Sequence, residues 1–241
     1  MLLLSVHPTV VMIHGAGGGG WEYEKWRPVF EAKGWKVINR DLEPVRGSYA
    51  STKLSDYVKQ VVSWCPKGEM IVLIGASMGG RLALEAARQV HPAAIVLVNS
   101  VPPTGLRRPK QPPIVRWANG PIKDTIDSMP DSDGPTIKWA WKRWRDESGA
   151  VMNELAKGGK FENPKCPVLV VIGENDTEIQ PAISRSMAKS FHAKVLSYRG
   201  MSHVGPLLSR SAKKVAADVM NELFHALPSG SNSTAAETNF R

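Results

Sequence analysis

The feature that most constrains the fold is a series of apolar, β-rich runs separated by segments with helical spacing. Runs that are apolar along their whole length are typical of strands covered on both faces, and strands that alternate with helices form parallel sheets. The alternation predicts an α/β protein, a three-layer α/β/α sandwich around a mostly parallel sheet of about six strands. The runs are Thr9 to Ile13, Trp35 to Asn39, Met70 to Ile74, Ala94 to Val98, Val168 to Ile172 and Lys194 to Tyr198.

Helices are expected between these runs. Apolar residues from Leu54 to Cys65 recur at helical spacing behind Ser51 and Thr52, which are typical capping residues. Further helices are expected over Arg81 to Val90 and around Val215 to Leu223. We therefore assign residues 1–100 and 161–227 to the core. Residues 228–241 are rich in Ser, Asn, Thr and Ala and are expected to form a disordered tail.

Residues 101–160, called the insertion segment below, interrupt this rhythm. Eight of the chain's eighteen prolines lie here, and no strand-like run is visible. Its second half predicts one or two short helices that end at Gly158 and Gly159. Because it contains eleven Lys and Arg against seven Asp and Glu, it is also basic. We expect a small helical lid, with Trp141 and Trp144 contacting substrate, since aromatic side chains commonly line pockets.

The formal charge of +9 raises the possibility of nucleic-acid binding, but the basic residues are spread along the chain. A preference for anionic substrates or an acidic carrier protein is the simpler interpretation. Cys65 and Cys166 show no metal-binding spacing, so neither a disulfide nor a metal site is expected. The first eight residues are too short for a signal peptide, and no apolar run has membrane-spanning length. A cytoplasmic protein is expected, and the sequence indicates no oligomeric state.

A serine stands in the sequence Gly75-Ala76-Ser77-Met78-Gly79, between an apolar run and a helix. Small residues on both sides allow a sharp strand-to-helix turn that projects the serine hydroxyl outward. The strand before the motif and the helix after it are the context that a nucleophilic serine requires. Ser77 is the predicted nucleophile.

A serine needs a base, and the base needs an orienting acid. His203 is the predicted base, because it alone among the six histidines lies in a short polar loop between the last run and the final helix. The loop after Val168 to Ile172 offers Glu174, Asp176 and Glu178. We choose Asp176, which lies deeper in the turn than Glu174 and has a short side chain. Alternatively, Asp176 could cap a turn or helix.

The glycine loop, residues 14–20, follows the first run and is expected to approach a ligand closely. Its Ala16 amide and the Met78 amide are the predicted oxyanion donors, and Gly15, Gly17 and Trp21 are assigned to substrate binding. His14 is expected to hold this loop. The glycines also match G-x-G-x-x-G, with Asp41 roughly 20 residues on, so dinucleotide binding stays an alternative.

Taken in order, these motifs resemble the α/β-hydrolase superfamily over nearly the whole chain up to the final helix. The resemblance implies Ser77 as nucleophile, His203 as general base and then acid, and Asp176 as its partner. Only about eight residues precede the first run, too few for the two strands that open the usual sheet. We therefore expect the hydrolase fold without its first two strands. The insertion segment corresponds to the lid of the superfamily.

The function that follows is hydrolysis of a small carboxylic ester or thioester through an acyl-enzyme, without cofactor. Two alternatives remain. The same triad in relatives cleaves carbon-carbon bonds of small diketo or anionic substrates, which a basic lid would suit. Some members of the superfamily keep the triad but act as ligand receptors.

Overall fold

The computed structural model describes residues 7–227, so the predicted tail lies outside the described residues. Its main sheet has six strands, all parallel, in the order β2-β1-β3-β4-β7-β8. Within the described residues these six parallel strands confirm the predicted sheet, and every predicted run contains or overlaps one strand. The strands are β1 (Thr9–Ile13), β2 (Lys36–Ile38), β3 (Ile71–Ala76), β4 (Ala94–Val98), β7 (Val168–Gly173) and β8 (Lys194–Tyr198).

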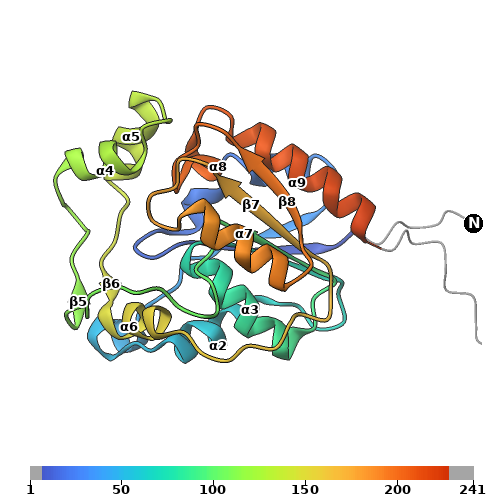
Figure 1. Ribbon diagram of the computed structural model, residues 1–241, viewed down its shortest axis with the longest axis horizontal. Coiled ribbons are helices and arrows are strands. Elements are labelled where there is room, and N and C mark those ends of the chain that lie inside the picture. The colour runs from blue at the N-terminus through green and yellow to red at the C-terminus, as the bar shows by residue number, and fades with distance from the viewer. Residues whose placement is uncertain (1–6, 228–241) are drawn as a thin grey trace, which may run out of the picture.

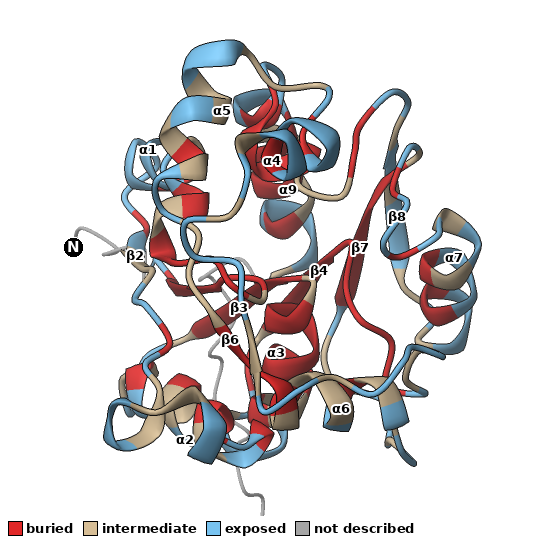
Figure 2. Ribbon diagram, turned by 90° about the vertical axis from the view of Figure 1, so that its left-hand side faces the viewer, coloured by how far each residue is buried: buried red, intermediate tan, exposed pale blue. Residues whose placement is uncertain are grey.

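Alternate residues of each central strand enter two separate apolar layers. In β1, Val11 and Ile13 pack with one layer of helices, whereas Val10 and Met12 pack with the other. Figure 2 shows β3, β4 and β7 buried along their length between these layers. The first layer contains α2 (Leu54–Trp64), α3 (Met78–Val90) and α7 (Pro181–Ser190), and the second α1 (Arg27–Glu31), α8 (Gly205–Leu208) and α9 (Ala212–Ala226). Both faces of the sheet are covered, as the unbroken apolar runs require.

The start of α2 differs from the prediction. The helix begins at Leu54 behind Lys53, and the Lys53 amide donates to Asp56 Oδ2 over 3.0 Å. Thr52 does not cap it, because its hydroxyl accepts from the Val45 amide and donates to the Ser48 carbonyl. The Thr52 side chain therefore forms its hydrogen bonds within the loop before α2. This loop contains the short 3-10 helices Val45–Gly47 and Tyr49–Ser51.

The insertion segment lies to one side of the sheet, with α4 and α5 at the left of Figure 1. It contains a strand pair that the sequence did not reveal, since each antiparallel strand has two residues. The helix α4 in its Pro-rich half was also missed, whereas the predicted end of α6 before Gly158 is confirmed. Its elements are β5 (Ile114–Val115), α4 (Ile122–Ser128), α5 (Gly134–Trp141), β6 (Glu147–Ser148) and α6 (Gly149–Lys157).

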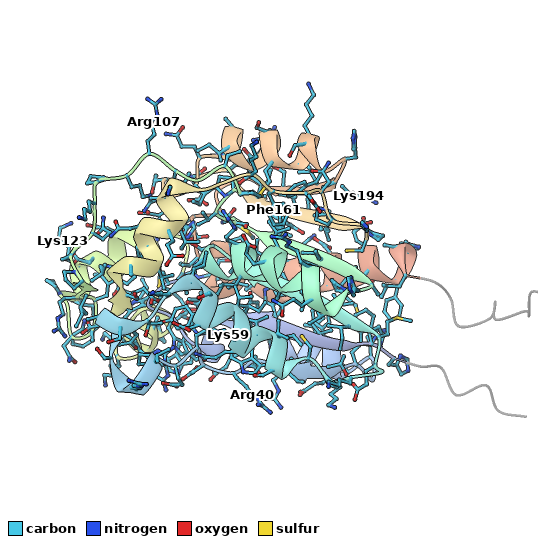
Figure 3. All side chains as sticks on the ribbon, turned by 90° about the horizontal axis from the view of Figure 1, so that it is seen from below. Arg40, Lys59, Arg107, Lys123, Phe161 and Lys194 are labelled. Carbon is cyan, nitrogen blue, oxygen red and sulfur yellow. The ribbon has the colours of Figure 1, made fainter. Side chains whose placement is uncertain are left out.

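Basic side chains are distributed over the surface. In Figure 3, Arg40, Arg107, Lys123 and Lys194 point outward from well-separated parts of the molecule. The chain has a net charge of +9, and these four basic side chains do not form a single patch. In the described part of the chain, no helix is long and apolar enough to span a membrane.

Candidate active site

Ser77 lies at the turn between β3 and α3, with φ 51° and ψ −117°. Positive φ is unfavourable for a residue with a Cβ, so this turn holds backbone strain. Side chains at the flanking glycines would collide with backbone: a Cβ on Gly75 would lie 2.2 Å from the Gly79 carbonyl oxygen, and one on Gly79 2.1 Å from that of Ile13. The glycines therefore permit the close contacts that fix the Ser77 turn beside β1.

His203 and Asp176 meet at the carboxyl ends of β7 and β8. Nδ1 of His203 is 2.8 Å from Oδ2 of Asp176. The other carboxylate oxygen accepts from the amides of Glu178 and Ile179 over 2.8 and 2.9 Å. The Asp176 side chain is fully buried and that of His203 is 16% exposed. The carboxylate places the proton on Nδ1, which leaves Nε2 as a proton acceptor.

The two other acids of this loop have different partners. Glu174 contacts Arg185 and the Ser197 hydroxyl. Glu178 forms an ion pair with Arg108 of the insertion segment over 2.9 Å. Asp176 alone of the three contacts His203 in the part of the chain that the structure describes.

Two side chains that the sequence did not single out as site residues hold the loop of His203. Asn99, directly after β4, donates from Nδ2 to the His203 carbonyl over 2.7 Å and accepts the Gly173 amide. Asp131 of the insertion segment accepts from the hydroxyl and the amide of Ser202 over 2.6 and 3.2 Å. The position of His203 thus depends on both the core and the insertion segment. Neither Asn99 nor Asp131 has a local sequence signal for this role, because the residues that they contact lie far away in the sequence.

Four amides of the glycine loop donate to other groups of the protein. Those of Gly15, Gly17 and Gly20 donate to the side chains of Glu22, Glu147 and Asp41, respectively. The Gly18 amide donates to the Gly15 carbonyl. Among the described residues the Ala16 amide has no acceptor, and Ala16 and Met78 both line the cavity described below. These contacts orient the loop and leave the Ala16 amide available for a ligand.

His14 is a buried part of this loop and not an accessible base. Its Nδ1 donates to the Gly15 carbonyl over 2.7 Å, and Nε2 accepts the Leu42 amide over 2.9 Å. Burial lowers the pKa of His14 to about 4, with Arg145 acting in the same direction. The neutral ring therefore joins the glycine loop to the segment after β2.

A cavity of about 340 Å³ opens beside Ser77 and His203. Of the residues that the sequence assigned to substrate binding, Gly15, Trp141 and Trp144 line it. Gly17 and Trp21 are not among the described residues of the lining. The Trp21 ring packs edge-on against Trp144 at 4.9 Å between centroids, and Trp139 packs against Trp21 at 5.2 Å. Other lining residues include Glu22, Val101, Arg108, Arg116, Trp117, Asp124, Thr125, Met152, Leu155, Glu178, Val204 and Leu207.

The basic character of the insertion segment does not reach the cavity as free charge. Arg116 forms an ion pair with Asp146 over 2.5 Å, and Arg108 is paired with Glu178. The cavity wall is otherwise rich in aromatic and aliphatic side chains. An uncharged ligand suits such a wall better than a polyanion.

Three polar residues around the glycine loop gave no sequence signal: the buried Glu22 and Glu147, and the partly exposed Arg145. Arg145 donates from its amide to the Gly17 carbonyl over 2.7 Å and from Nε to the Gly18 carbonyl over 2.9 Å. Glu147 also accepts the hydroxyl of Tyr57 over 2.8 Å. The insertion segment therefore binds the glycine loop directly.

The structure also bears on cofactors. The Asp41 carboxylate, which a dinucleotide site would need for ribose, accepts the Gly20 amide over 2.7 Å. No group of three or more metal-ligating side chains occurs within residues 7–227. Cys65 and Cys166 are both free thiols.

Comparison with known proteins adds sequence relatives. Salicylic acid-binding protein 2 of Nicotiana tabacum is 33% identical over 102 residues, covering 38% of this chain and 39% of that protein. Norfluorocurarine synthase 1 of Strychnos is 30% identical over 111 residues, 41% of each chain. The matched region thus spans about two fifths of these curated relatives.

The fold is shared far more widely than the sequence. A methylesterase structure from Arabidopsis superposes with a TM-score of 0.71 at 16% identity, covering 90% of this chain and 99% of the other. The profile of the Alpha/beta hydrolase family matches residues 10–218, which is most of the chain. The serine turn, the sheet order and this match lead to one conclusion: the chain belongs to the alpha/beta hydrolase family.

Proposed function

We propose that the chain hydrolyses small carboxylic esters through an acyl-enzyme on Ser77. The observation that carries the proposal is the 2.8 Å contact between His203 and Asp176, with His203 and Ser77 on the wall of one cavity. A positively charged His203 would be stabilised by the buried carboxylate, as a general base requires. The match to methylesterase structures and to the family supports the same class of reaction.

The reaction has two halves. Ser77 Oγ attacks the ester carbonyl carbon while its proton passes to His203 Nε2, and the Ala16 and Met78 amides stabilise the oxyanion. The carbon-oxygen bond to the alcohol then breaks, and the alcohol oxygen takes the proton from His203. In the second half, water loses a proton to His203, attacks the acyl carbon and releases the acid, and Ser77 regains its proton.

The cavity favours a compact, largely uncharged ester. Its volume of about 340 Å³ is at the lower end of the range for small-molecule sites, roughly 300 to 1,000 Å³. The aromatic wall from Trp117, Trp141 and Trp144 suits an apolar acyl group. We propose that the insertion segment acts as the lid over this group. A thioester with an equally small acyl group is the chemical variant that the same triad would accept.

A fluorophosphonate probe tests the proposal, because it reacts with an activated serine. Purified wild type should be labelled stoichiometrically, and Ser77→Ala should not. A panel of methyl, ethyl and aryl esters with small acids, together with matched thioesters, then identifies the bond. A folded wild type that resists the probe and turns over no member of the panel would contradict the proposal.

The names of the relatives suggest two alternative functions. One curated relative is named a synthase, and another is named for binding salicylic acid. Turnover of small β-keto or diketo acids without ester hydrolysis would favour carbon-carbon bond cleavage. Tight binding of salicylate with no labelling at Ser77 would favour a receptor.

A further inference from the structure

Glu22 is a buried carboxyl group that the proposed reaction does not use. It lies in the 3-10 helix η1 (Gly20–Tyr23), directly after the glycine loop, and is 3% exposed. Oε2 accepts the Gly15 amide over 3.1 Å. A Cβ on Gly18 would lie 1.7 Å from Oε1. The glycine loop is therefore folded around this carboxyl group, and a glycine at position 18 makes room for it.

The same carboxyl group lies beside the serine. A Cβ built on Gly15 would be 3.4 Å from the Ser77 Cβ and 3.8 Å from Glu22 Oε2, so both side chains flank one residue. Glu22 also belongs to the wall of the 340 Å³ cavity. The Gly15 amide is the one donor it has within residues 7–227. Asp176 differs in that three donors converge on its carboxylate.

The surroundings of Glu22 disfavour its charge. Burial raises the pKa of Glu22 to about 7, against smaller opposing effects from the Gly15 amide, His203 and Arg145. The Asp41 carboxylate acts in the same direction as burial. The neighbouring Tyr23 hydroxyl donates to the Ile13 carbonyl and gives Glu22 no hydrogen bond. One hydrogen-bond donor is too few to compensate a buried carboxylate.

We propose that Glu22 is a positioning residue of the hydrolytic reaction, which holds the Ala16 amide in place through the Gly15 amide and works as a neutral carboxylic acid. The inference rests on the proposed function. In this state the carbonyl oxygen Oε2 accepts the Gly15 amide and the proton resides on Oε1. A negative Glu22 beside Ser77 would oppose the negative charge that forms on the ester oxygen.

This role predicts a particular pH dependence. Hydrolysis by a serine triad rises with pH as the base becomes neutral, and then levels off. Here the rate should fall again above pH of about 7, as Glu22 ionises. If Glu22 had only a structural role, the hydrolysis rate would stay on its plateau at alkaline pH.

The experiment compares wild type with Glu22→Gln and Glu22→Ala in the full chain, from pH 5 to 9. Two rates are measured, kcat/KM for the best ester and the second-order rate of Ser77 labelling by the fluorophosphonate. Gln keeps an acceptor for the Gly15 amide and cannot ionise, so it should keep wild-type rates within about threefold at pH 6 and lose the alkaline decline. Ala removes the acceptor and should lose about tenfold or more at every pH. The matched control is Glu24→Gln, an exposed residue of the same segment, which should reproduce the wild-type profile.

The outcomes separate the two proposals. A labelled wild type with the same alkaline decline in Glu22→Gln, or with no decline at all, would overturn the role of Glu22 alone. Equal losses in Glu22→Gln and Glu22→Ala at all pH values would also overturn it, because the retained acceptor would then not matter. A wild type that is never labelled would overturn the proposed function first. If thermal unfolding shows that Glu22→Ala does not fold, the pH profile of Glu22→Gln still decides whether Glu22 has this role.

Discussion

His14 and His203 both follow strands of the main sheet, β1 and β8, and they show how one residue type is used in two ways. Both nitrogens of His14 are bonded to backbone groups, and the residue is 1% exposed. His203 is bonded by Nδ1 to a carboxylate, and its side chain borders the cavity. The difference lies in the partners: backbone groups and the Arg145 guanidinium, 3.4 Å from Nε2, hold a neutral His14 ring, whereas a buried carboxylate contacts the His203 ring, which gains a proton in the proposed reaction.

The largest effect on this comparison is expected from removing His203, the proposed base. We expect His203→Ala to lower kcat for ester hydrolysis by about 10⁴-fold or more, because Ser77 then has no group to take its proton. Ser77→Ala should lose a similar factor, and the double variant should lose no more than either alone. Steady-state kinetics on folded proteins measures this. His203→Ala with near-normal kcat would show that another group is the base.

The next largest effect is expected at the partner of His203. Asp176→Asn keeps an oxygen for the Glu178 and Ile179 amides but no longer fixes the ring as a hydrogen-bond donor at Nδ1. We expect kcat to fall by roughly 10³- to 10⁴-fold. Glu174→Gln is the control, because Glu174 contacts Arg185 on the outer side of the same loop. A comparable loss in the control would point to loop disorder as the cause.

The sheet and the residues of the serine turn could be predicted because the information is local. Strands such as Thr9–Ile13 are unbroken apolar runs, and Gly75 and Gly79 have steric reasons visible in the motif itself. Chain order then places His203 and Asp176 in neighbouring loops at the same edge of the sheet. Chain order and loop position thus predict a contact between His203 and Asp176, and the two side chains lie 2.8 Å apart.

The contacts between distant segments could not be predicted in this way. The two-residue strands β5 and β6 are too short for any periodicity, and their pairing joins residues about thirty positions apart. Trp21 and Trp144 were both expected at the substrate, yet Trp21 packs behind Trp144. An aromatic residue signals burial in a sequence, but the sequence does not say whether a ligand or another side chain covers it.

The burial of His14 can be tested through stability. Its pKa of about 4 in the folded chain is below the ordinary 6.5, so the folded state binds fewer protons than the unfolded state between these values. The stabilising contribution of neutral His14 is complete above pH 6.5 and is lost as pH falls toward 4, by up to roughly 3 kcal/mol. Urea unfolding of His14→Asn and wild type should therefore give free energies that converge as the pH is lowered.

The difference between variant and wild type is the quantity to follow. Glu22 titrates in the opposite sense, since its raised pKa favours the folded state at low pH and this contribution declines as pH rises from 4.5 to about 7. The slope of the wild type alone is thus a sum of opposed effects. His225→Asn, at an exposed site on α9, is the control for the same substitution outside the glycine loop. A constant difference for His14→Asn would mean that His14 is accessible to solvent.

The smallest expected effect concerns the link between the insertion segment and the two histidines. Arg145 and Glu147 hold the loop of His14, and Asp131 holds Ser202 next to His203. We expect Asp131→Asn to lower kcat about threefold with little change in Tm, because the amide keeps one acceptor for Ser202 while the charge-assisted hydrogen bond is lost. Asp127→Asn, whose exposed ion pair with Lys123 lies elsewhere in the segment, should leave kcat unchanged. Equal kinetics for Asp131→Asn and wild type would show that the core alone, through Asn99, holds His203, and that the insertion segment positions only the glycine loop.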